Sequence, residues 1–221
     1  ECSSTNSEAR ALADGVDDPT GLVVVADQQH AGRGRLGRRW ETAAGQNLLF
    51  SLVLTPAVLP QFAPVCVLAW AAAMADELDC LVKWPNDLVT RDGKKLGGIL
   101  AELSSEAETI RYVVLGVGIN ANQQDFPGLP HATSLVAERG EAIDRAEWLA
   151  RLVKAIEAVA IDRFPSLDGW RRRSHTLGKR VRVNGIEGVA SDLREDGALI
   201  VDGQVILAGD VELVGSKNER A

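Results

Sequence analysis

The stretch KWPNDLVTRDGKKLGGILAEL, residues 83–103, carries the clearest strand and turn signals in the chain. Its first residues end an apolar run with strand character. Pro85 then interrupts that run, because proline cannot donate a hydrogen bond to a central β-ladder. The segment 87–103 predicts a β-hairpin with Asp92 and Gly93 in its turn. The fold is therefore expected to be organised around this hairpin.

Apolar and β-branched runs on both sides of the hairpin predict further strands. These expected strands cover residues 21–27, 47–54, 81–84 and 109–120. The run at 21–27 is rich enough in valine to predict a buried strand. Residues 123–134 are rich in residues that break regular structure and predict a loop.

Helices are expected between the strands and after them. Thr5, followed three residues later by Glu8, is typical of a capping box in which Thr5 is the N-cap of a helix ending near Ala13. Asp144 and Glu147 form a second such signal. The other expected helices cover residues 64–78, from Asp144 to about Arg163, and 166–173.

The last part of the chain consists of short apolar segments separated by Asn-Gly and Asp-Gly pairs. Asn184-Gly185 and Asp202-Gly203 predict tight hairpin turns, and about forty residues of this kind are typical of a small β-barrel. We therefore expect an α+β fold, with a mixed β-sheet and helices on its faces. The predicted division is a first domain over 1–176 and a small β-barrel over 177–221.

Composition limits the classes of protein to be considered. The chain has 221 residues, 46% of them hydrophobic, and a formal net charge of -7. The acidic balance argues against general nucleic-acid binding. No apolar run is long enough to span a bilayer and no signal-peptide pattern opens the chain, so a cytoplasmic protein is expected. The chain has an odd number of cysteines, Cys2, Cys66 and Cys80, which favours free thiols in a reducing compartment.

The segment AGRGRLGRRW, residues 31–40, is strongly cationic within this acidic chain. Its glycines allow backbone N–H groups to approach an anion closely. Its arginines match the geometry of phosphate and carboxylate oxygens. Trp40 closes the segment with an aromatic face. A Walker loop is excluded because the G-K-[ST] ending is missing. The alternative is an ordinary solvated basic loop.

Other short stretches place polar or small residues where strands and helices are expected to end. These are Asn86 and Asp87 in KWPNDL (83–88), a lysine before two glycines in KKLGGIL (94–100), Asn120 in GVGIN (116–120), SSTN (3–6), and Gln28 with Gln29. Each has a structural explanation as a turn, a hairpin lysine, a strand end, a helix cap or a surface amide. None decides alone between structure and ligand binding.

Taken together and in this order, the stretches resemble a biotin–protein ligase. The pair GRGRxGRxW and KWPND is a specific signature, and the resemblance covers nearly the whole chain. It implies a catalytic domain of the biotin/lipoate ligase type, similar in fold to class II aminoacyl-tRNA synthetases, followed by an SH3-like barrel. No helix-turn-helix domain precedes the catalytic part, so the monofunctional type without a DNA-binding domain is expected.

The resemblance implies an activity with ATP, biotin and Mg²⁺. Biotin is activated to biotinyl-5′-AMP and is then transferred to a lysine of a biotin carboxyl carrier protein. A mobile Gly/Arg segment that orders over the ligand would neutralise anions and exclude water from the adenylate. No nucleic-acid or membrane partner is expected, and a homodimer is left open.

The resemblance also implies roles for individual residues. The catalytic set is Lys95, Arg33, Arg35 and Asp87. The expected biotin contacts are Ser4, Thr5, Asn6, Gln29, Gly32, Arg33, Arg35, Lys95 and Gly98. The expected ATP and adenylate contacts are Arg33, Gly34, Arg35, Trp40, Asn86, Lys95, Gly118 and Asn120. No firm metal ligand is expected, although Asp87 and Asn120 mark a Mg²⁺ neighbourhood. Lys94 competes with Lys95 for the role of active lysine.

There are three rival functions: one of the same superfamily, one of a different class and one without catalysis. A lipoate or octanoate ligase or transferase has a similar fold but lacks the GRGRxGR and KWPND pair. A nucleic-acid-binding module would need aromatic stacking platforms, and residues 177–216 contain no Phe, Trp or Tyr. A homologue that only binds biotin is not favoured either, because every motif residue required for the chemistry is present.

Overall fold

The first sheet is built from apolar strands. The computed structural model describes residues 1–159 and 164–215 of the chain. In this part of the chain the first sheet has six antiparallel strands in the order β1-β2-β6-β5-β4-β3. Their bounds are β1 Val23–Ala26, β2 Leu48–Leu54, β3 Leu81–Lys83, β4 Asp87–Val89, β5 Lys95–Glu106 and β6 Thr109–Ile119.

The predicted hairpin is confirmed as β4 and β5. β3 ends at Lys83 and β4 begins at Asp87, so the chain breaks at the Trp84–Pro85 step as expected. Gly93 has a φ of +86°, a left-handed conformation that glycine adopts without steric cost. The turn therefore falls where the Asp-Gly pair predicted it.

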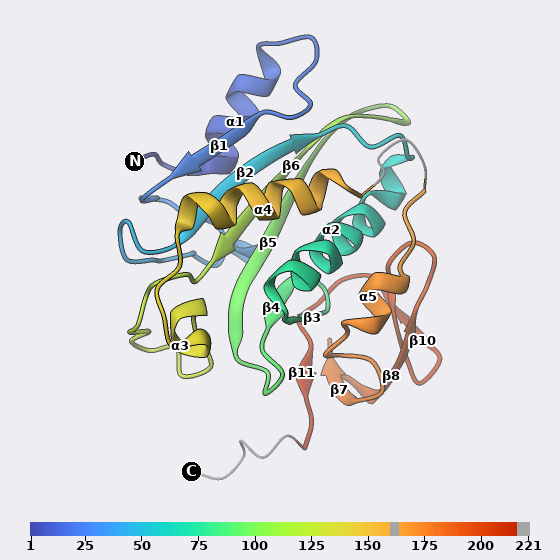
Figure 1. The fold of residues 1–221 in the computed structure, drawn as a ribbon. Coiled ribbons are helices and arrows are strands. Elements are labelled where there is room, and N and C mark those ends of the chain that lie inside the picture. Colours follow the sequence, from blue (N-terminus) through green and yellow to red (C-terminus); the bar gives the residue numbers. More distant parts are fainter. Residues whose placement is uncertain (160–163, 216–221) are drawn as a thin grey trace.

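The two faces of the sheet carry different layers. Alternate residues of β2, such as Phe50 and Leu52, pack with helices α2 (Ala63–Leu78) and α4 (Arg145–Glu157). Val53 points to the opposite face and packs with α1 (Thr5–Asp14). Figure 1 shows α2 and α4 lying side by side across one face, with α1 beyond the other.

The second sheet lies at the C-terminal end of the described chain and has the order β10-β9-β8-β7-β11. Its strands are β7 Arg180–Val183, β8 Ile186–Leu193, β9 Leu199–Val201, β10 Gln204–Ile206 and β11 Glu212–Leu213. Asn184-Gly185 and Asp202-Gly203 all have positive φ and form the expected tight turns. This small SH3-like barrel agrees with the predicted fold class. The larger sheet is antiparallel rather than mixed, because each of its strand pairs runs antiparallel.

The two sheets share one hydrophobic core. The main cluster of buried residues contains Phe50 of the first sheet and Val181 and Leu199 of the second. Trp84 is buried between them and donates from Nε1 to the carbonyl oxygen of Gly197 at 3.1 Å. The division between residues 176 and 177 therefore stays a prediction.

The remaining helices are α3 (Leu135–Arg139) and α5 (Asp168–Arg172). Asp144 caps α4 as predicted, because its carboxylate accepts from the backbone N–H of Ala146 at 2.8 Å. The helix ends at Glu157 rather than near Arg163, and residues 160–163 of the expected extension lie outside the described residues. Among the helices of the described chain, none combines the length and apolar character needed to cross a lipid bilayer.

Two local predictions are wrong, and one helix was not predicted. Strand β1 is an edge strand, paired only with β2, and Val25 is exposed rather than buried. Thr5 is not the N-cap of α1, because Ser4 occupies that position without a side-chain cap and Thr5 lies inside the helix. Helix α3 follows the expected loop at 123–134 without having been predicted. Five residues are too few for a periodic pattern to show.

Candidate active site

The floor of the site is a patch of sheet without side chains. Gly98 of β5 lies opposite Gly118 of β6, and Gly116 lies two residues further along β6, on the α1 side of the sheet. A Cβ on Gly118 would lie 2.6 Å from the indole of Trp40, and one on Gly116 would overlap the Asn6 amide. The glycines therefore admit Asn6 and Trp40 directly onto the backbone.

A cavity of about 530 Å³ opens above this floor. Its volume lies within the range of ligand pockets in proteins. The predicted site residues that line it are Ser4, Thr5, Asn6, Gln29, Arg33, Gly34, Arg35, Trp40, Asn86, Asp87, Lys95, Gly98, Gly118 and Asn120. Gly32 is not among the lining residues. Its carbonyl accepts from the Trp40 backbone N–H at 2.9 Å, which closes the base of the arginine segment.

The polar end of the cavity is formed at the start of α1. The Oε1 atom of Gln29 accepts from the backbone N–H of Thr5 at 2.8 Å and from its Oγ1 at 3.1 Å. Ser51 of β2 is fully buried, and its Oγ lies 2.8 Å from Thr5 Oγ1. Sequence reasoning missed Ser51, because a serine within a buried strand has no local signal of its partners. Thr5 serves the cavity rather than capping the helix.

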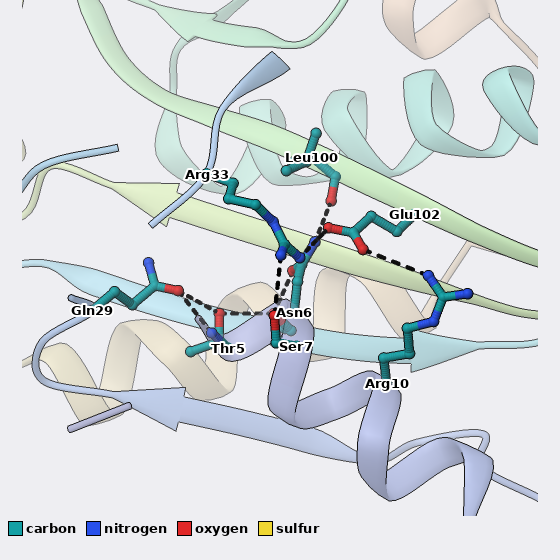
Figure 2. Close-up of polar contacts among 9 residues, drawn as sticks. Thr5, Asn6, Ser7, Arg10, Gln29, Arg33, Leu100 and Glu102 are labelled. Carbon is teal, nitrogen blue, oxygen red and sulfur yellow. Dashed lines mark hydrogen bonds and ion pairs between the residues drawn. The ribbon is translucent and has the colours of Figure 1, made fainter. Parts of the chain in front are cut away.

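Asn6 and Arg33 meet at a carboxylate that was not predicted, Glu102 of β5. Figure 2 shows Glu102 between Arg33, Asn6 and Arg10. Arg33 Nη2 lies 2.7 Å from Glu102 Oε1, and its Nη1 donates to Ser7 Oγ at 3.1 Å. Arg33 therefore lines the cavity while its guanidinium is held from the side of α1 and β5.

Arg35 reaches across to the small barrel. Its Nη1 lies 3.2 Å from Oδ1 of Asp210, between β10 and β11, and contacts the Asn86 side chain and the Gly209 carbonyl at 3.3 Å each. Arg38 pairs with Asp210 Oδ2 at 2.8 Å. One carboxylate thus ties the arginine segment to the second sheet. No sequence signal indicates this contact, which joins residues 175 positions apart.

Lys95 is the cavity lysine. Its Nζ lies 2.7 Å from Oδ1 of Asp87 and 5.4 Å from the centre of the Trp40 ring. Lys94 is not part of the cavity lining, and its ammonium pairs with Asp92 at 3.2 Å in the hairpin turn. Lys95 is therefore the lysine that lines the cavity, and which of the two lysines acts in the reaction stays a prediction.

The two asparagines predicted to contact ATP have protein partners. Asn86 Nδ2 donates to the Ile99 carbonyl at 2.8 Å. Asn120 is buried and donates from Nδ2 to the Thr133 carbonyl at 2.9 Å. Thr133 N in turn donates to the Lys95 carbonyl at 2.9 Å. Asn120 therefore holds the following loop against the strand that carries Lys95.

That loop is a part of the site that sequence reasoning described only as breaker-rich. Phe126, Gly128, Leu129, Pro130, His131 and Ala132 all line the cavity. The Lys95 backbone N–H donates to the His131 carbonyl at 2.7 Å, which fixes the loop to the start of β5. The loop supplies an apolar wall beside the lysine.

The lining offers little for a protein-bound metal. Within the described residues, there is no group of three or more His, Cys, Asp or Glu side chains that could hold a metal ion. The lining includes two carboxylates, Asp87 and Glu41. Mg²⁺ is commonly held by one or two carboxylates together with nucleotide phosphates and water. The residues present fit a Mg²⁺ ion carried mainly by ATP, and Asp87, which also pairs with Lys95, would be the carboxylate nearest to the predicted reacting centre.

Each of the three predicted catalytic cations has a carboxylate partner. Arg33 pairs with Glu102, Arg35 with Asp210, and Lys95 with Asp87. Trp40 has a buried indole N–H with no partner among the described residues. The cavity thus combines a hydroxyl and amide end with an end that has a cation, an aromatic ring and an uncommitted donor.

Known proteins resemble this chain over almost its full length. A family model described as "Biotin/lipoate A/B protein ligase family" matches residues 3–120. A biotin--[acetyl-CoA-carboxylase] ligase of Mycobacterium tuberculosis is 37% identical, covering 94% of this chain and 85% of that protein. The bifunctional ligase/repressor BirA of Bacillus spizizenii is 34% identical, covering 96% and 71%.

A solved structure agrees with the sequence relatives. The biotin protein ligase from Aquifex aeolicus, in complex with biotin and ATP, matches with a TM-score of 0.76 and 31% identity. The match covers 96% of this chain and 95% of that one. The motifs, the fold and these matches agree, and the chain belongs to the biotin/lipoate A/B protein ligase family.

Proposed function

We propose that this protein is a biotin–[biotin carboxyl carrier protein] ligase. It joins biotin to ATP as biotinyl-5′-AMP and then transfers biotin to a lysine of the carrier. The observation that carries the proposal is a single cavity with a hydroxyl and amide end and a lysine and tryptophan end on one glycine floor. The named relatives and the solved ligase with biotin and ATP support the same reaction.

The polar end suits the ureido ring of biotin. That ring presents two N–H donors and one carbonyl acceptor in a plane. Thr5 Oγ1 and Gln29 Oε1 are held 3.1 Å apart by their own hydrogen bond, so both are already positioned before a ligand arrives. Positioned groups of this kind give orientation and specificity. Ser4 and Asn6 line the same end.

The adenylation step requires two anions to approach each other. A carboxylate oxygen of biotin attacks the α-phosphorus of ATP, the Pα–O bond to pyrophosphate breaks, and pyrophosphate leaves. Lys95 contributes a cation at the middle of the cavity, where it neutralises charge at the biotin carboxylate and the α-phosphate. Gly98 and Gly118 let the ligand approach the backbone, and Trp40 offers its ring to adenine. Mg²⁺, when bound, neutralises phosphate charge.

The transfer step requires a neutral amine. The carrier lysine attacks the acyl carbon of the adenylate, the bond from that carbon to the AMP oxygen breaks, and the amine loses a proton. Asp87 is the group assigned to orient that amine and accept its proton, because its carboxylate lines the cavity beside Lys95. Asp87→Asn is expected to slow carrier labelling more than pyrophosphate exchange, because exchange depends on Asp87 only through the position of Lys95.

The arginine segment serves to exclude water. An acyl adenylate hydrolyses easily, so the site must cover it until the carrier arrives. Residues 31–40 lie over the cavity from one side and the loop at 126–132 from another. Arg33 and Arg35 place additional cations near the phosphates.

The first experiment is ATP–pyrophosphate exchange with Mg²⁺, comparing biotin, lipoate, octanoate and no acid. Exchange with biotin alone supports the proposal. Exchange with lipoate or octanoate would instead indicate a lipoate or octanoate ligase of the same family. The absence of exchange with every one of these acids, from a folded sample, would contradict an adenylating enzyme. Labelling of a purified carrier domain with radioactive biotin then tests the second step.

Two finer expectations accompany the reaction. A cytoplasmic location agrees with Cys2, Cys66 and Cys80, which are free thiols in the structure. Fractionation of cells with an antibody to the chain tests it. The homodimer stays a prediction that light scattering of the purified protein, with and without biotin, can check.

A further inference from the structure

Glu102 lies outside the cavity lining but touches two residues that form it. It belongs to β5, on the same side of the strand as Gly98 and Leu100, where alternate residues share a face. Its side chain is only 22% exposed. A carboxylate that is this well covered requires charged or hydrogen-bonding partners to offset its desolvation.

The two partners come from different parts of the chain. Glu102 Oε1 lies 2.7 Å from Arg33 Nη2 and accepts from Asn6 Nδ2 at 3.0 Å. Its other oxygen lies 4.0 Å from Arg10 Nη1, a distance that adds charge but no short hydrogen bond. Figure 2 shows Arg33 and Asn6 converging on Glu102.

Asn6 extends this contact into the polar end of the cavity. Its Nδ2 also donates to the Leu100 carbonyl at 3.2 Å, while its Oδ1 accepts from Ser51 Oγ at 2.6 Å. Ser51 contacts Thr5 in turn. Both donor and acceptor atoms of the Asn6 amide are thereby used in one orientation. The amide fits over Gly116, where no side chain could be accommodated.

We infer that Glu102 is a positioning residue that couples the arginine segment at 31–40 to the polar end of the cavity. One carboxylate oxygen holds Arg33 over the site and fixes the Asn6 amide that supports Ser51 and Thr5. Ordering the segment and organising the ligand contacts are therefore linked events. This inference rests on the proposed function only for the identity of the ligand, since the link itself is a property of the protein.

The test uses the full chain and a cleavage readout that does not require activity. Leu36 is 75% exposed within the segment, and thermolysin cuts before such residues. Glu102→Gln is expected to speed cleavage before Leu36 about fivefold, since it removes one partly exposed ion pair. It is also expected to raise the KM for biotin about tenfold with kcat changed less than about twofold.

Matched controls separate this link from general destabilisation. Glu106→Gln alters another glutamate of β5 that forms no ion pair within the described residues, and Arg10→Gln removes only the 4.0 Å contact. Both are expected to behave as the unaltered protein. Arg33→Gln breaks the same link from the exposed side, and adding Glu102→Gln to it is expected to cause no further increase in cleavage.

Each outcome has one meaning. Equal cleavage and equal biotin KM in Glu102→Gln and Glu106→Gln would overturn the inference, as would additive effects of Glu102→Gln and Arg33→Gln. If Glu102→Gln fails to fold, Arg33→Gln with unchanged cleavage before Leu36 overturns it. Failure of the proposed function is a separate result, because it shows as absent biotin-dependent exchange in the unaltered protein while the cleavage comparison still reports on the link.

Discussion

Lys95 and Asp87 form an ion pair of 2.7 Å between Nζ and Oδ1 across the hairpin of β4 and β5. Lys95 is the first residue of β5, and Asp87 is the first residue of β4. The two groups therefore reach the cavity from adjacent strands. A reacting carboxylate or phosphate placed here meets a cation already held in position, with little reorganisation needed.

Lys95→Ala is expected to reduce biotin-dependent pyrophosphate exchange by about 100-fold or more, because it removes the cation at the reacting centre. Lys94→Ala is the matched control, since Lys94 belongs to the turn and pairs with Asp92. Thermal unfolding should show both variants folded. The assignment would be reversed if Lys94→Ala lost exchange and Lys95→Ala kept it.

Asp210→Asn is expected to loosen the arginine segment, because Asp210 accepts from both Arg35 and Arg38. These pairs are partly exposed, so we expect only about a fivefold rise in the KM for biotin and ATP. Glu212→Gln is the control, since Glu212 contacts only Arg182 at 3.8 Å among the described residues. Identical kinetics in the two variants would exclude a role for the barrel in holding the segment.

Asp210→Asn is a better test of the contact between the barrel and the arginine segment than deletion of residues 177–216. Trp84 packs into the shared core and bonds to the Gly197 carbonyl. Deleting the barrel would expose that core and leave the tryptophan N–H without its partner. Loss of activity after deletion would therefore not distinguish contact with the segment from loss of folding.

Gly118→Ala is expected to impair nucleotide binding more than Gly98→Ala. The new methyl at 118 would lie 2.6 Å from the Trp40 indole, whereas at 98 the nearest atom of Trp40 is 3.4 Å away. Trp40 must therefore move in the first variant, and we expect about a tenfold rise in the KM for ATP. Exchange measured against ATP concentration gives the ranking, and equal effects would argue against Trp40 as part of the nucleotide site.

The stability of the fold is expected to fall with pH below neutrality because of His175. Burial, with nearby Lys179 and Lys83, lowers the pKa of His175 to about 4. The unfolded histidine has its ordinary pKa of about 6.5, so the unfolded chain binds the proton first as the pH falls. The contribution of neutral His175 to stability is complete above pH 6.5 and is lost progressively between about 6.5 and 4.

Urea denaturation at several pH values checks this expectation. The free energy of unfolding should fall by about 2 kcal/mol between pH 7 and 4.5. His175→Gln should remove most of that fall, because glutamine does not titrate. An equal fall in both proteins would assign the acid sensitivity to other groups, such as the carboxylates paired with arginine.

Local patterns predicted most of the elements for identifiable reasons. The Asp-Gly and Asn-Gly turns at 92–93, 184–185 and 202–203 were correct, because Gly93 and both residues of the other two pairs have a positive φ, which few residue types adopt easily. The Asp144 cap was correct because a short carboxylate side chain can accept from the free backbone N–H groups at the start of a helix. The Thr5 cap was wrong because Gln29, 24 residues away, competes for the same hydroxyl and N–H.

The sequence by itself determined the motifs whose residues line the cavity, and the role of each residue in the reaction stays a prediction. Three features depend only on neighbouring residues and can be predicted from the sequence. They are the glycines at 97–98 and at 116 and 118, the arginine segment, and the choice between strand and turn. Only the tertiary structure decided which charged side chains form ion pairs with each other. The register of β5 turns Lys95, rather than Lys94, toward Asp87. Folding of the chain brings Glu102 to Arg33 and Asp210 to Arg35. Ion pairs between residues so far apart in sequence have no period and no local spacing, because they exist only once the sheets and helices have packed together.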